Sequence, residues 1–509
     1  MPTASTYREV EFKLRVDRDF HLPSLEGVGS GDVSVEAQPT FQMRNVYFDT
    51  HDFALFRWRV TLRRREGGPD AGWHLKLPVA GFGGTVRDEV RMPLTDDQHH
   101  VPAELTTIVA AFLRDAPIAE VVTLHSQRSP MLFRNSAGRV IAEFVDDTVS
   151  IGDDDTKSFA FREIEVEAVP DQDGRLDLAV VNAVVNRVID AGAVRGSMSK
   201  AAAALGAQTS AACDVPEPKR PRRRDPVGEV VRAYFATHVR QLFFADVQFR
   251  QDMPDSVHQF RVAARRLRSG LRIFRPFLDR AWADALHEEL TWIGRSFGQA
   301  RDGEVLLLRL AEQCSHLPVA DAERAYAEVA HALNEQLHNG VAGAHAQLHT
   351  ARYTQLLNLL VDAAQNPPLT RRAEVPAGSV LPNIVRHNYK RLSHAVSALT
   401  MDSPATQWHA ARIIAKRARY AAEAAAPTLG KKTKRLAREL SRGTEVLGLH
   451  QDAYVFQRKL SDIALSTNGS TGFSLGLLSQ LELAAQVRCR SEFLDARWPD
   501  ISRTAKRTW

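Results

Sequence analysis

The chain has 509 residues, of which 44% are hydrophobic and 25% are charged, and its formal net charge is +5. This composition excludes fibrous and broadly disordered classes, and the length predicts more than one domain. Three widely separated cysteines argue against a disulfide framework or a zinc site, and no apolar run approaches the roughly 18 residues of a membrane helix. Because the N-terminus also lacks the layout of a secretory signal, we expect a cytoplasmic protein that does not contact membranes.

Residues 1–206 are predicted to form a β-rich domain. Short segments with a period of two recur, beginning with YREVEFKLRV at residues 7–16, and turns such as EGGPDAG separate them. We expect roughly eight strands, which favour a closed antiparallel barrel or a sandwich. Residues 174–205 are expected to add a helix and a short final segment.

Residues 207–226 are predicted to be a linker. The stretch is rich in proline, lysine and arginine, and such a polar run cannot pack a core. Its basic cluster, KRPRRR, is either a solvated tether or a contact for an anionic partner.

Residues 227–505 are predicted to be helical, because Ala, Leu, Arg and Glu recur there at helical spacing. Two motifs occur twice: VHQFRVAARRLRSGLRIF (257–274) matches WHAARIIAKRARYAAEAA (408–425), and FGQARD (297–302) matches LGLHQD (447–452). Two matches at nearly the same offset predict a duplicated helical bundle, with copies over about 227–365 and 378–505.

The repeated helix carries a basic stripe opposite its apolar face. The stripe consists of His258, Arg261, Arg265, Arg268 and Arg272 in the first copy, and of His409, Arg412, Lys416 and Arg419 in the second, where Glu423 replaces the fifth basic residue. Like charges four residues apart repel, so we expect an anionic partner, with a solvated face as the alternative. Of the aromatic residues only Tyr420 lies near these stripes, which favours inorganic polyphosphate over nucleic acid.

Charged residues also share faces along the predicted strands. They are Glu9, Glu11 and Lys13; Arg63 and Arg65; His74 and Lys76; Arg87, Glu89 and Arg91; Glu143 and Asp147; and Glu163, Glu165 and Glu167. These faces point either to water on a sandwich or into the lumen of a barrel. In a lumen, carboxylates from the first and last strands would meet basic residues from the middle strands. Carboxylates suit Mg²⁺ or Mn²⁺, and arginine and lysine suit phosphates, so the second arrangement predicts a metal–phosphate site.

Two family resemblances agree with this interpretation. HxxRVxxRRLRxxLxxF, FGxARD and WHxxRIxxKRxRY resemble the CHAD domain over about 227–505, which implies two pseudo-symmetric helical bundles that bind inorganic polyphosphate. The N-terminal ExExK, followed in order by YFDT, LRRR, LKLP, RDE and EIEVE, resembles the CYTH domain of the triphosphate tunnel metalloenzymes over about 1–205. This second resemblance implies an eight-stranded antiparallel barrel that hydrolyses or cyclises triphosphate compounds with a divalent metal.

The CYTH resemblance also implies residue roles. Metal binding and orientation of the attacking water are implied for Glu9, Glu11, Glu165 and Glu167, with Glu143 and Asp147 on the metal side. Phosphate binding is implied for Lys13, Arg63, Arg65, Lys76, Arg87, Arg128 and Lys200. We expect Lys13 to be catalytic together with the first four carboxylates.

We therefore expect a two-domain α+β protein in which the barrel, with Mg²⁺ or Mn²⁺, hydrolyses inorganic triphosphate or a related triphosphate compound. The helical domain is expected to bind polyphosphate, and polyphosphate granules are a further expected location. One alternative is class IV-type adenylate cyclase or thiamine triphosphatase chemistry in the same tunnel. The other is a non-catalytic, granule-associated polyphosphate-binding protein.

Overall fold

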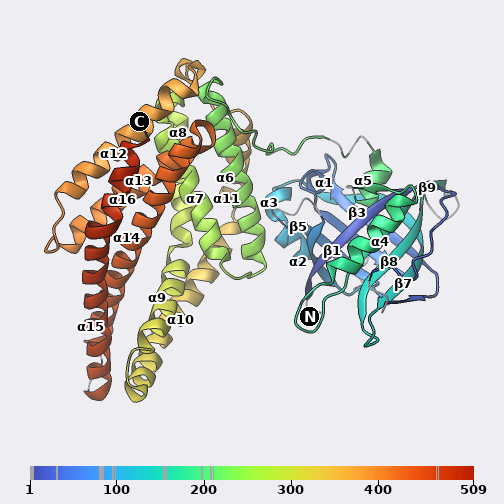
Figure 1. Cartoon of the computed structure of the whole chain (residues 1–509), viewed down its shortest axis with the longest axis horizontal. Coiled ribbons are helices and arrows are strands. Elements are labelled where there is room, and N and C mark those ends of the chain that lie inside the picture. Colours follow the sequence, from blue (N-terminus) through green and yellow to red (C-terminus); the bar gives the residue numbers. More distant parts are fainter. Residues whose placement is uncertain are drawn as a thin grey trace. The chain divides into compact units, whose positions relative to one another are not determined.

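The structure is a computed structural model that describes residues 5–29, 33–79, 85–94, 97, 99–152, 158–196, 199–206, 209, 211–465, 467 and 469–508. The chain divides into two compact units, Met1–Asp214 and Val215–Trp509 (Figure 1). Each unit has its own core and is described by itself.

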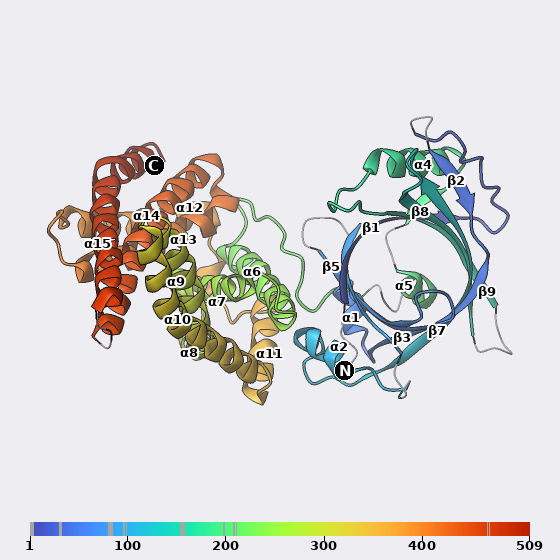
Figure 2. The same ribbon diagram turned by 90° about the horizontal axis from the view of Figure 1, so that it is seen from below.

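Within its described residues, the first unit is built on a closed barrel of eight antiparallel strands (Figure 2). The strands are β1 (Ser5–Val16), β3 (Phe41–Thr50), β4 (Thr61–Glu66), β5 (Gly72–Pro78), β6 (Val86–Met92), β7 (Ile118–Arg134), β8 (Val140–Ile151) and β9 (Ser158–Ala168). Their order is β1-β6-β5-β4-β3-β7-β8-β9, and β9 pairs back to β1, which closes the sheet. The barrel expected from the alternating segments is confirmed, and the sandwich is excluded.

Outward-facing apolar residues of the barrel pack under a helix. This helix, α4 (Leu178–Asp190), begins at Asp177, whose carboxylate accepts hydrogen bonds from two backbone N–H groups of the first turn. Leu14, Ile164 and Val184 lie in the same core cluster and are fully buried. The apolar side of the β1 alternation therefore faces α4, which leaves the charged side for the lumen.

A second short helix closes part of one end of the lumen. This helix, α5 (Lys200–Leu205), begins at Ser199, whose hydroxyl accepts the N–H of Ala202. Ala201 packs against Tyr47 and Leu124 of the barrel wall. Figure 2 shows α5 inside the ring of strands. Smaller elements complete the unit: β2 (Ser34–Ala37), β10 (Val194–Gly196), α1 (Ala54–Arg57), α2 (Ala103–Ile108) and α3 (Ala110–Leu113).

The described residues of the second unit form helices and no strand. The α-helices are α6 (Val227–Arg250), α7 (Ser256–Ile273), α8 (Arg280–Ser296), α9 (Gly298–Cys314), α10 (Val319–Leu348), α11 (Ala351–Gln365), α12 (Ala377–Ser397), α13 (Ala405–Leu429), α14 (Lys431–Ala464), α15 (Gly469–Ser491) and α16 (Trp498–Lys506). Short helical turns η2 (Arg275–Phe277), η3 (Arg371–Glu374) and η4 (Glu492–Arg497) connect them.

The predicted duplication is visible in the backbone of this unit. The N–H of Val227 donates to the carbonyl of Val375 at 2.9 Å, and the N–H of Ala377 donates to the carbonyl of Asp225 at 2.9 Å. The two bonds are equivalent in the two copies. Val227 corresponds to Ala377 and Asp225 corresponds to Val375, in each case 150 positions apart. The first halves of the two copies, α6–α7 and α12–α13, therefore meet about a local twofold axis.

The predicted linker, residues 207–226, contains the boundary between the units. Its residues 207, 208 and 210 lie outside the described residues. Its second half is bound to the helical unit, since Arg220 Nε donates to the carbonyl of Pro427 at 2.9 Å. The N–H of Gly378 likewise donates to the carbonyl of Arg223 at 2.7 Å.

Two glycines of α10 give a matched test of helix packing. A Cβ on Gly340 would stand 2.3 Å from the backbone nitrogen of Ala300 in α9, whereas a Cβ on Gly343 would meet nothing within 4 Å. We expect Gly340→Ala to lower the free energy of unfolding of the helical unit by about 1–3 kcal/mol, because α9 must move away. Gly343→Ala is expected to raise it by up to about 1 kcal/mol through helix propensity. Urea denaturation followed by circular dichroism measures both, and equal effects would contradict the close approach.

Candidate functional site

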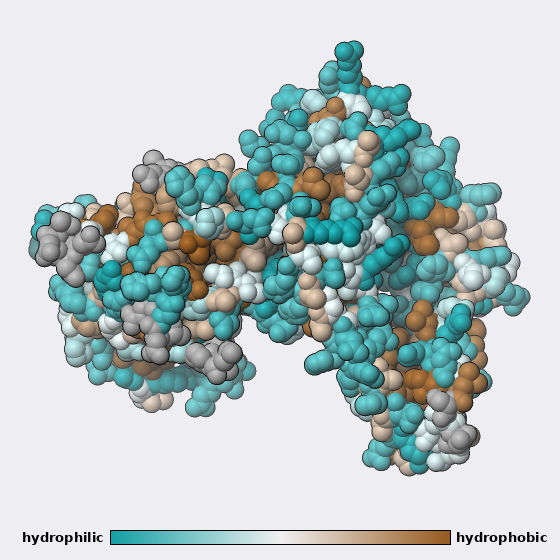
Figure 3. Space-filling view, turned by 180° about the vertical axis from the view of Figure 1, so that it is seen from behind, coloured by the Kyte–Doolittle hydropathy of each residue, from teal (hydrophilic) through white to brown (hydrophobic). Residues whose placement is uncertain are grey.

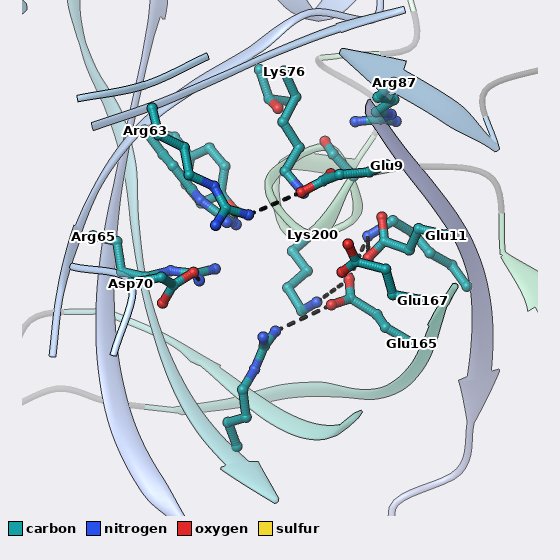
Figure 4. Close-up of a pocket in the computed structure, with 16 residues that line it drawn as sticks. Glu9, Glu11, Arg63, Arg65, Asp70, Lys76, Arg87, Glu165, Glu167 and Lys200 are labelled. Carbon is teal, nitrogen blue, oxygen red and sulfur yellow. Dashed lines mark hydrogen bonds and ion pairs between the residues drawn. The ribbon is translucent and has the colours of Figure 1, made fainter. Parts of the chain in front are cut away.

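One cavity in the barrel lumen collects the charged side chains of the strands. Figure 4 shows the labelled side chains pointing toward one another from several strands and from α5. Every residue predicted to be catalytic or substrate-binding lines this cavity: Glu9, Glu11, Lys13, Arg63, Arg65, Lys76, Arg87, Arg128, Glu165, Glu167 and Lys200. The structure therefore brings the predicted set together, while the role of each residue stays a prediction.

Strand register sets which of these side chains are neighbours. In the β1–β9 pair, Glu11 lies opposite Glu167 and Lys13 lies opposite Glu165. On the other side of β1, Glu9 lies opposite a basic residue of β6, Arg87. Directly opposed residues of antiparallel strands project to the same face, so closure of the barrel joins the first and last acidic rows.

One ion-pair network surrounds Glu9. Lys76 Nζ lies 2.6 Å from one of its oxygens, and Arg91 Nη2 lies 3.2 Å from the other. Burial raises the pKa of Glu9, and the positive charge of Lys76 opposes that rise. Behind this pair, the fully buried Glu89 is 2.9 Å from His74 Nδ1 and also contacts Lys76 and Arg91. The network holds Lys76 in place from two strands.

A second network surrounds Glu165. Lys13 and Lys200 both form ion pairs with its carboxylate, and Arg128 Nη2 lies 3.1 Å from Oε2. Burial alone would raise the pKa of Glu165, but the three cations lower it well below its usual range. Burial would also lower the pKa of Lys13, but Glu11 and Glu165 raise it above its usual range. Both partners are therefore charged at neutral pH.

Glu167 is the carboxylate of the lumen that lacks a cation. It forms no ion pair with any described residue, although it lines the cavity beside Glu11. Burial and the nearby carboxylates of Glu9 and Glu11 together raise the pKa of Glu167 to about 8. Glu167 is thus protonated at neutral pH unless another cation enters the lumen.

Two arginines of β4, Arg63 and Arg65, are held by two neutral side chains and one carboxylate. Arg65 Nε donates to Asn45 at 3.0 Å and its Nη1 is ion-paired with Asp70, while Arg63 Nη1 lies 3.4 Å from the Tyr47 hydroxyl. Burial and the charge of Arg63 lower the pKa of Arg65 to about 10. These contacts orient two forked donors toward the cavity, a geometry that suits phosphate oxygens.

The balance of charge in the lumen favours anions. The cavity is lined by eight cationic side chains, which include Arg91, and by five carboxylates, which include Asp70. Free space in the cavity is about 60 Å³, because the ion pairs fill most of it. A polyanion can therefore bind only by taking cations such as Lys13 and Lys76 away from their carboxylates. The surplus of positive charge supplies the driving force for that exchange.

The donor set fits a divalent cation in its chemistry. Glu9, Glu11 and Glu167 offer the hard oxygen atoms that Mg²⁺ and Mn²⁺ prefer, and Glu167 lacks a compensating charge. Among the described residues, no group of three or more His, Cys, Asp or Glu is spaced to hold an ion as it stands. The carboxylates would have to turn from Lys13 and Lys76 toward the metal.

Two predicted metal-side residues do not line the cavity. Asp147 is fully buried, and its oxygens accept both arms of Arg128 at 3.0 and 2.7 Å, while Lys200 Nζ lies 3.1 Å away. It is therefore placed to orient Arg128 and Lys200. Glu143 is partly buried, and burial raises its pKa. Both metal assignments stay predictions.

Five residues that line the cavity were not predicted to be site residues: Tyr47, Thr61, Asp70, Arg91 and Ser199. Alternation along the strand indicates Arg91, because it shares its face with Arg87. Tyr47 is indicated by the register of β3 and β4, which sets it opposite Arg63. Asp70 lies in a turn, where alternation carries no information about direction.

The basic stripes of the second unit lie on α7 and α13. At the centre, Arg265 is close enough to Arg412 and Lys416 to affect the pKa values of both. The Nε atoms of Arg265 and Arg412 are buried without a hydrogen-bond partner. Arg268 is surrounded by positive charges, and its pKa is lowered by burial and by Arg272. The two stripes thus form one basic cluster rather than two separate faces.

In both copies, the second repeated motif places a glycine and an aspartate beside the basic stripe. A Cβ on Gly298 would lie 3.5 Å from Nη1 of Arg261, and a Cβ on Gly448 would lie 3.8 Å from Nη2 of Arg412. These glycines leave room for the arginine side chains to lie across the neighbouring helix. Arg261 also lies 3.9 Å from Asp302, and the corresponding Asp452 raises the pKa of Arg412 against the effect of burial.

Burial and the charges of Arg412 and Arg265 together lower the pKa of Lys416 to about 7. Lys416 therefore changes its charge near neutral pH. By contrast, Arg419 is neutralised by Glu423, which accepts its Nε at 2.7 Å. His409 lies 2.7 Å from a side-chain oxygen of Gln451. The predicted stripe thus includes both unpaired and paired members.

Every helix in the described part of the chain is too short or too polar to span a membrane. In the face that Figure 3 shows, hydrophilic residues predominate and hydrophobic ones form small groups.

Family comparisons cover both units. A model of the CYTH domain matches residues 7–177, and a model of the CHAD domain matches residues 233–461. Uncharacterized proteins from two strains of Mycobacterium tuberculosis are each 33% identical over 511 residues, covering 96% of this chain and 96% of the relative.

Two solved structures resemble part of the chain. PptA from Streptomyces chartreusis is 21% identical, covers 54% of this chain and 99% of its own, and has a TM-score of 0.47. The CHAD domain from the plant Ricinus communis is 24% identical, covers 56% of this chain and 94% of its own, and has a TM-score of 0.46.

The two domain matches lie in the order predicted from the motifs, and the relatives extend over nearly the whole length. The chain belongs to the family of proteins that join a CYTH domain to a CHAD domain.

Proposed function

We propose that the barrel hydrolyses inorganic triphosphate, or a closely related triphosphate compound, with a divalent cation. The observation that carries this proposal is the lumen lining, in which eight cations surround carboxylates that include one without a cationic partner. Such a site favours a short, highly charged anion together with a metal ion. Among the described residues of the lining, Tyr47 is the only aromatic one, and its hydroxyl lies 3.4 Å from Arg63, so a base-free substrate fits best.

Different residues of the chain would have different roles in this reaction. Arg63, Arg65 and Arg128 would hold phosphate oxygens and stabilise the charge that develops on them. A bound divalent cation, which Glu9, Glu11 and Glu167 would hold, would supply further neutralisation of the phosphate charge. Glu11 and Glu167, opposed across β1 and β9, would orient the attacking water and accept its proton. Lys13, whose Nζ lies 3.3 Å from Glu11, would turn from that carboxylate to a phosphate oxygen.

The direct test compares substrates and variants. Purified full-length chain is incubated with triphosphate, ATP or thiamine triphosphate and with Mg²⁺ or Mn²⁺, and the products are identified. We expect orthophosphate and pyrophosphate from triphosphate, and a loss of kcat on the order of 100-fold in Glu9→Gln or Glu11→Gln. Glu120→Gln, an exposed change of the same type, is the control.

Other outcomes of this assay support the alternatives. Conversion of ATP alone to cyclic AMP would establish the cyclase instead. Preferred turnover of thiamine triphosphate would establish thiamine triphosphatase chemistry. Turnover that is absent with every substrate and metal would favour a non-catalytic protein.

Metal binding gives a readout that does not depend on turnover. Because the pKa of Glu167 is raised to about 8, the folded chain carries a proton there at neutral pH, and a metal ion must displace it. We expect Mn²⁺ affinity, measured by calorimetry, to rise on the order of tenfold per pH unit between pH 6 and 8. Glu167→Gln should flatten this slope, whereas Glu120→Gln should not. The same slope in Glu167→Gln would exclude Glu167 as a metal ligand.

We further propose that the cluster on α7 and α13 binds inorganic polyphosphate. The support is the group formed by Arg265, Arg268 and Lys416, none of which forms an ion pair with a described residue. A bound polyanion would restore the charge of Lys416, so affinity should fall as the pH rises through 7. We expect binding on the order of tenfold weaker at pH 8 than at pH 6, at constant ionic strength.

Lys416→Arg is the matched variant for this prediction, because arginine stays charged over the whole range. The histidines of the stripe are common to both chains, so the difference between the two pH profiles isolates Lys416. Identical profiles would contradict a role for Lys416. Unchanged polyphosphate affinity in Arg265→Glu would exclude the cluster as the site.

A further inference from the structure

The duplication of the helical unit creates two equivalent pockets. One, the α12 pocket, has a volume of about 510 Å³ and lies among α12, α13 and the end of α7. The other, the α6 pocket, has a volume of about 320 Å³ and lies among α6, α7 and the end of α13. Val380 and Pro276 line the first where Val230 and Pro427 line the second. The volumes lie in the range of small-molecule sites.

The two pockets differ sharply in charge. In the α6 pocket, Arg266 is neutralised by Glu423 at 2.7 Å. The residues at the corresponding positions of the α12 pocket are Arg417 and Arg272, so an ion pair is replaced by two like charges. Arg391 of α12 adds a third guanidinium. The duplication therefore gives one pocket that is balanced and one that carries an excess of positive charge.

The three arginines of the α12 pocket have no anionic partner in the described structure. None of them forms an ion pair or a hydrogen bond with a described residue, and the Nε atom of Arg417 is buried without a partner. Burial together with the charges of Arg272 and Arg391 lowers the pKa of Arg417. Arg272 and Arg391 are exposed, so only the Nε atom of Arg417 is a buried donor of the kind that is costly unless a ligand satisfies it.

The α12 pocket also lacks the chain segment that lines its counterpart. Residues 218–221 line the α6 pocket, and Arg220 bonds there to Pro427. The equivalent residue of the second copy, Thr370, donates to the carbonyl of Pro276 at 3.2 Å, but its segment does not line the α12 pocket. This pocket is therefore larger and is left open for a ligand.

The remaining wall of the α12 pocket is apolar with a few amide groups. Ile273, Ile384 and the ring of Tyr420 provide the apolar surface. Asn388 donates its side-chain N–H to the carbonyl of Ile384 at 2.9 Å, which leaves its amide oxygen as an acceptor, and Asn383 lies one turn earlier. An inorganic phosphate chain has no apolar surface to pack against this wall. A nucleobase, by contrast, packs on apolar and aromatic side chains and forms hydrogen bonds with amides.

We propose that the α12 pocket binds a nucleotide, with its phosphates on Arg272, Arg391 and Arg417 and its base against Ile384 and Tyr420. This site is separate from the barrel lumen, and it shares Arg272 with the end of the basic cluster. It goes beyond hydrolysis and polyphosphate binding, and it gives the helical unit a small-molecule ligand of its own.

The test is equilibrium binding of ATP to the full-length chain in EDTA, measured by calorimetry. Arg391→Gln and Arg417→Gln should each weaken binding on the order of tenfold. Asn383→Trp, which fills the pocket from an exposed position without changing its charge, should also abolish binding. Arg438→Gln, on an exposed face of α14, is the matched control and should leave binding unchanged.

Two further arms separate this site from the lumen and from simple anion binding. Binding should persist in Arg65→Ala, which alters the lumen, so failure of the triphosphatase proposal would leave this result intact. Inorganic triphosphate should displace ATP at least about tenfold less effectively than unlabelled ATP does, because it lacks the apolar body. Equal displacement by triphosphate, or full ATP affinity in Arg417→Gln and Asn383→Trp with unchanged thermal stability, would overturn the proposal.

Discussion

The pairing of β1 with β9 is the constraint on which the candidate active site depends. These strands are more than 140 residues apart in the chain, yet their register sets Glu11 opposite Glu167 and Lys13 opposite Glu165. Closure of the sheet also removes its free edges and turns one face of every strand into the wall of a lumen. Without this pairing, the acidic rows would lie on the two edges of an open sheet and could not share a metal ion.

The lumen in this structure is held by its own charges. Lys76 is bound to Glu9 and Lys200 to Glu165, and the residual space is small. Ion pairs in a buried place are costly to break singly but exchange readily for another ion of the same sign. A metal–phosphate complex offers both signs at once, so carboxylates and cations can each find a new partner. Glu167 is the exception, because its raised pKa keeps it protonated until a cation arrives.

In the helical unit, the features that the two copies share and the position at which they differ have different consequences. The reciprocal bonds of Val227 and Ala377 preserve the local twofold, and the Gly–Arg contact beside each stripe is likewise repeated. The single change at the position of Arg272 and Glu423 breaks the equivalence. It neutralises Arg266 and Arg419 on one side and leaves Arg417 unpaired on the other. Together with Arg391 and the segment 218–221, this substitution distinguishes two pockets that share a backbone framework.

The sequence by itself determined the strand faces, the two-part organisation and the internal repeat. The β1 alternation assigned Glu9, Glu11 and Lys13 to one side because side-chain direction in a strand depends only on parity. Helical spacing likewise assigned Arg261, Arg265 and Arg268 to one stripe. Only the tertiary structure decided which charges meet: that Arg128 is bound by Asp147, and that Asp70 reaches Arg65 from a turn. Local periodicity specifies where a side chain points along its own element, whereas its partner depends on register and on helix packing between distant segments.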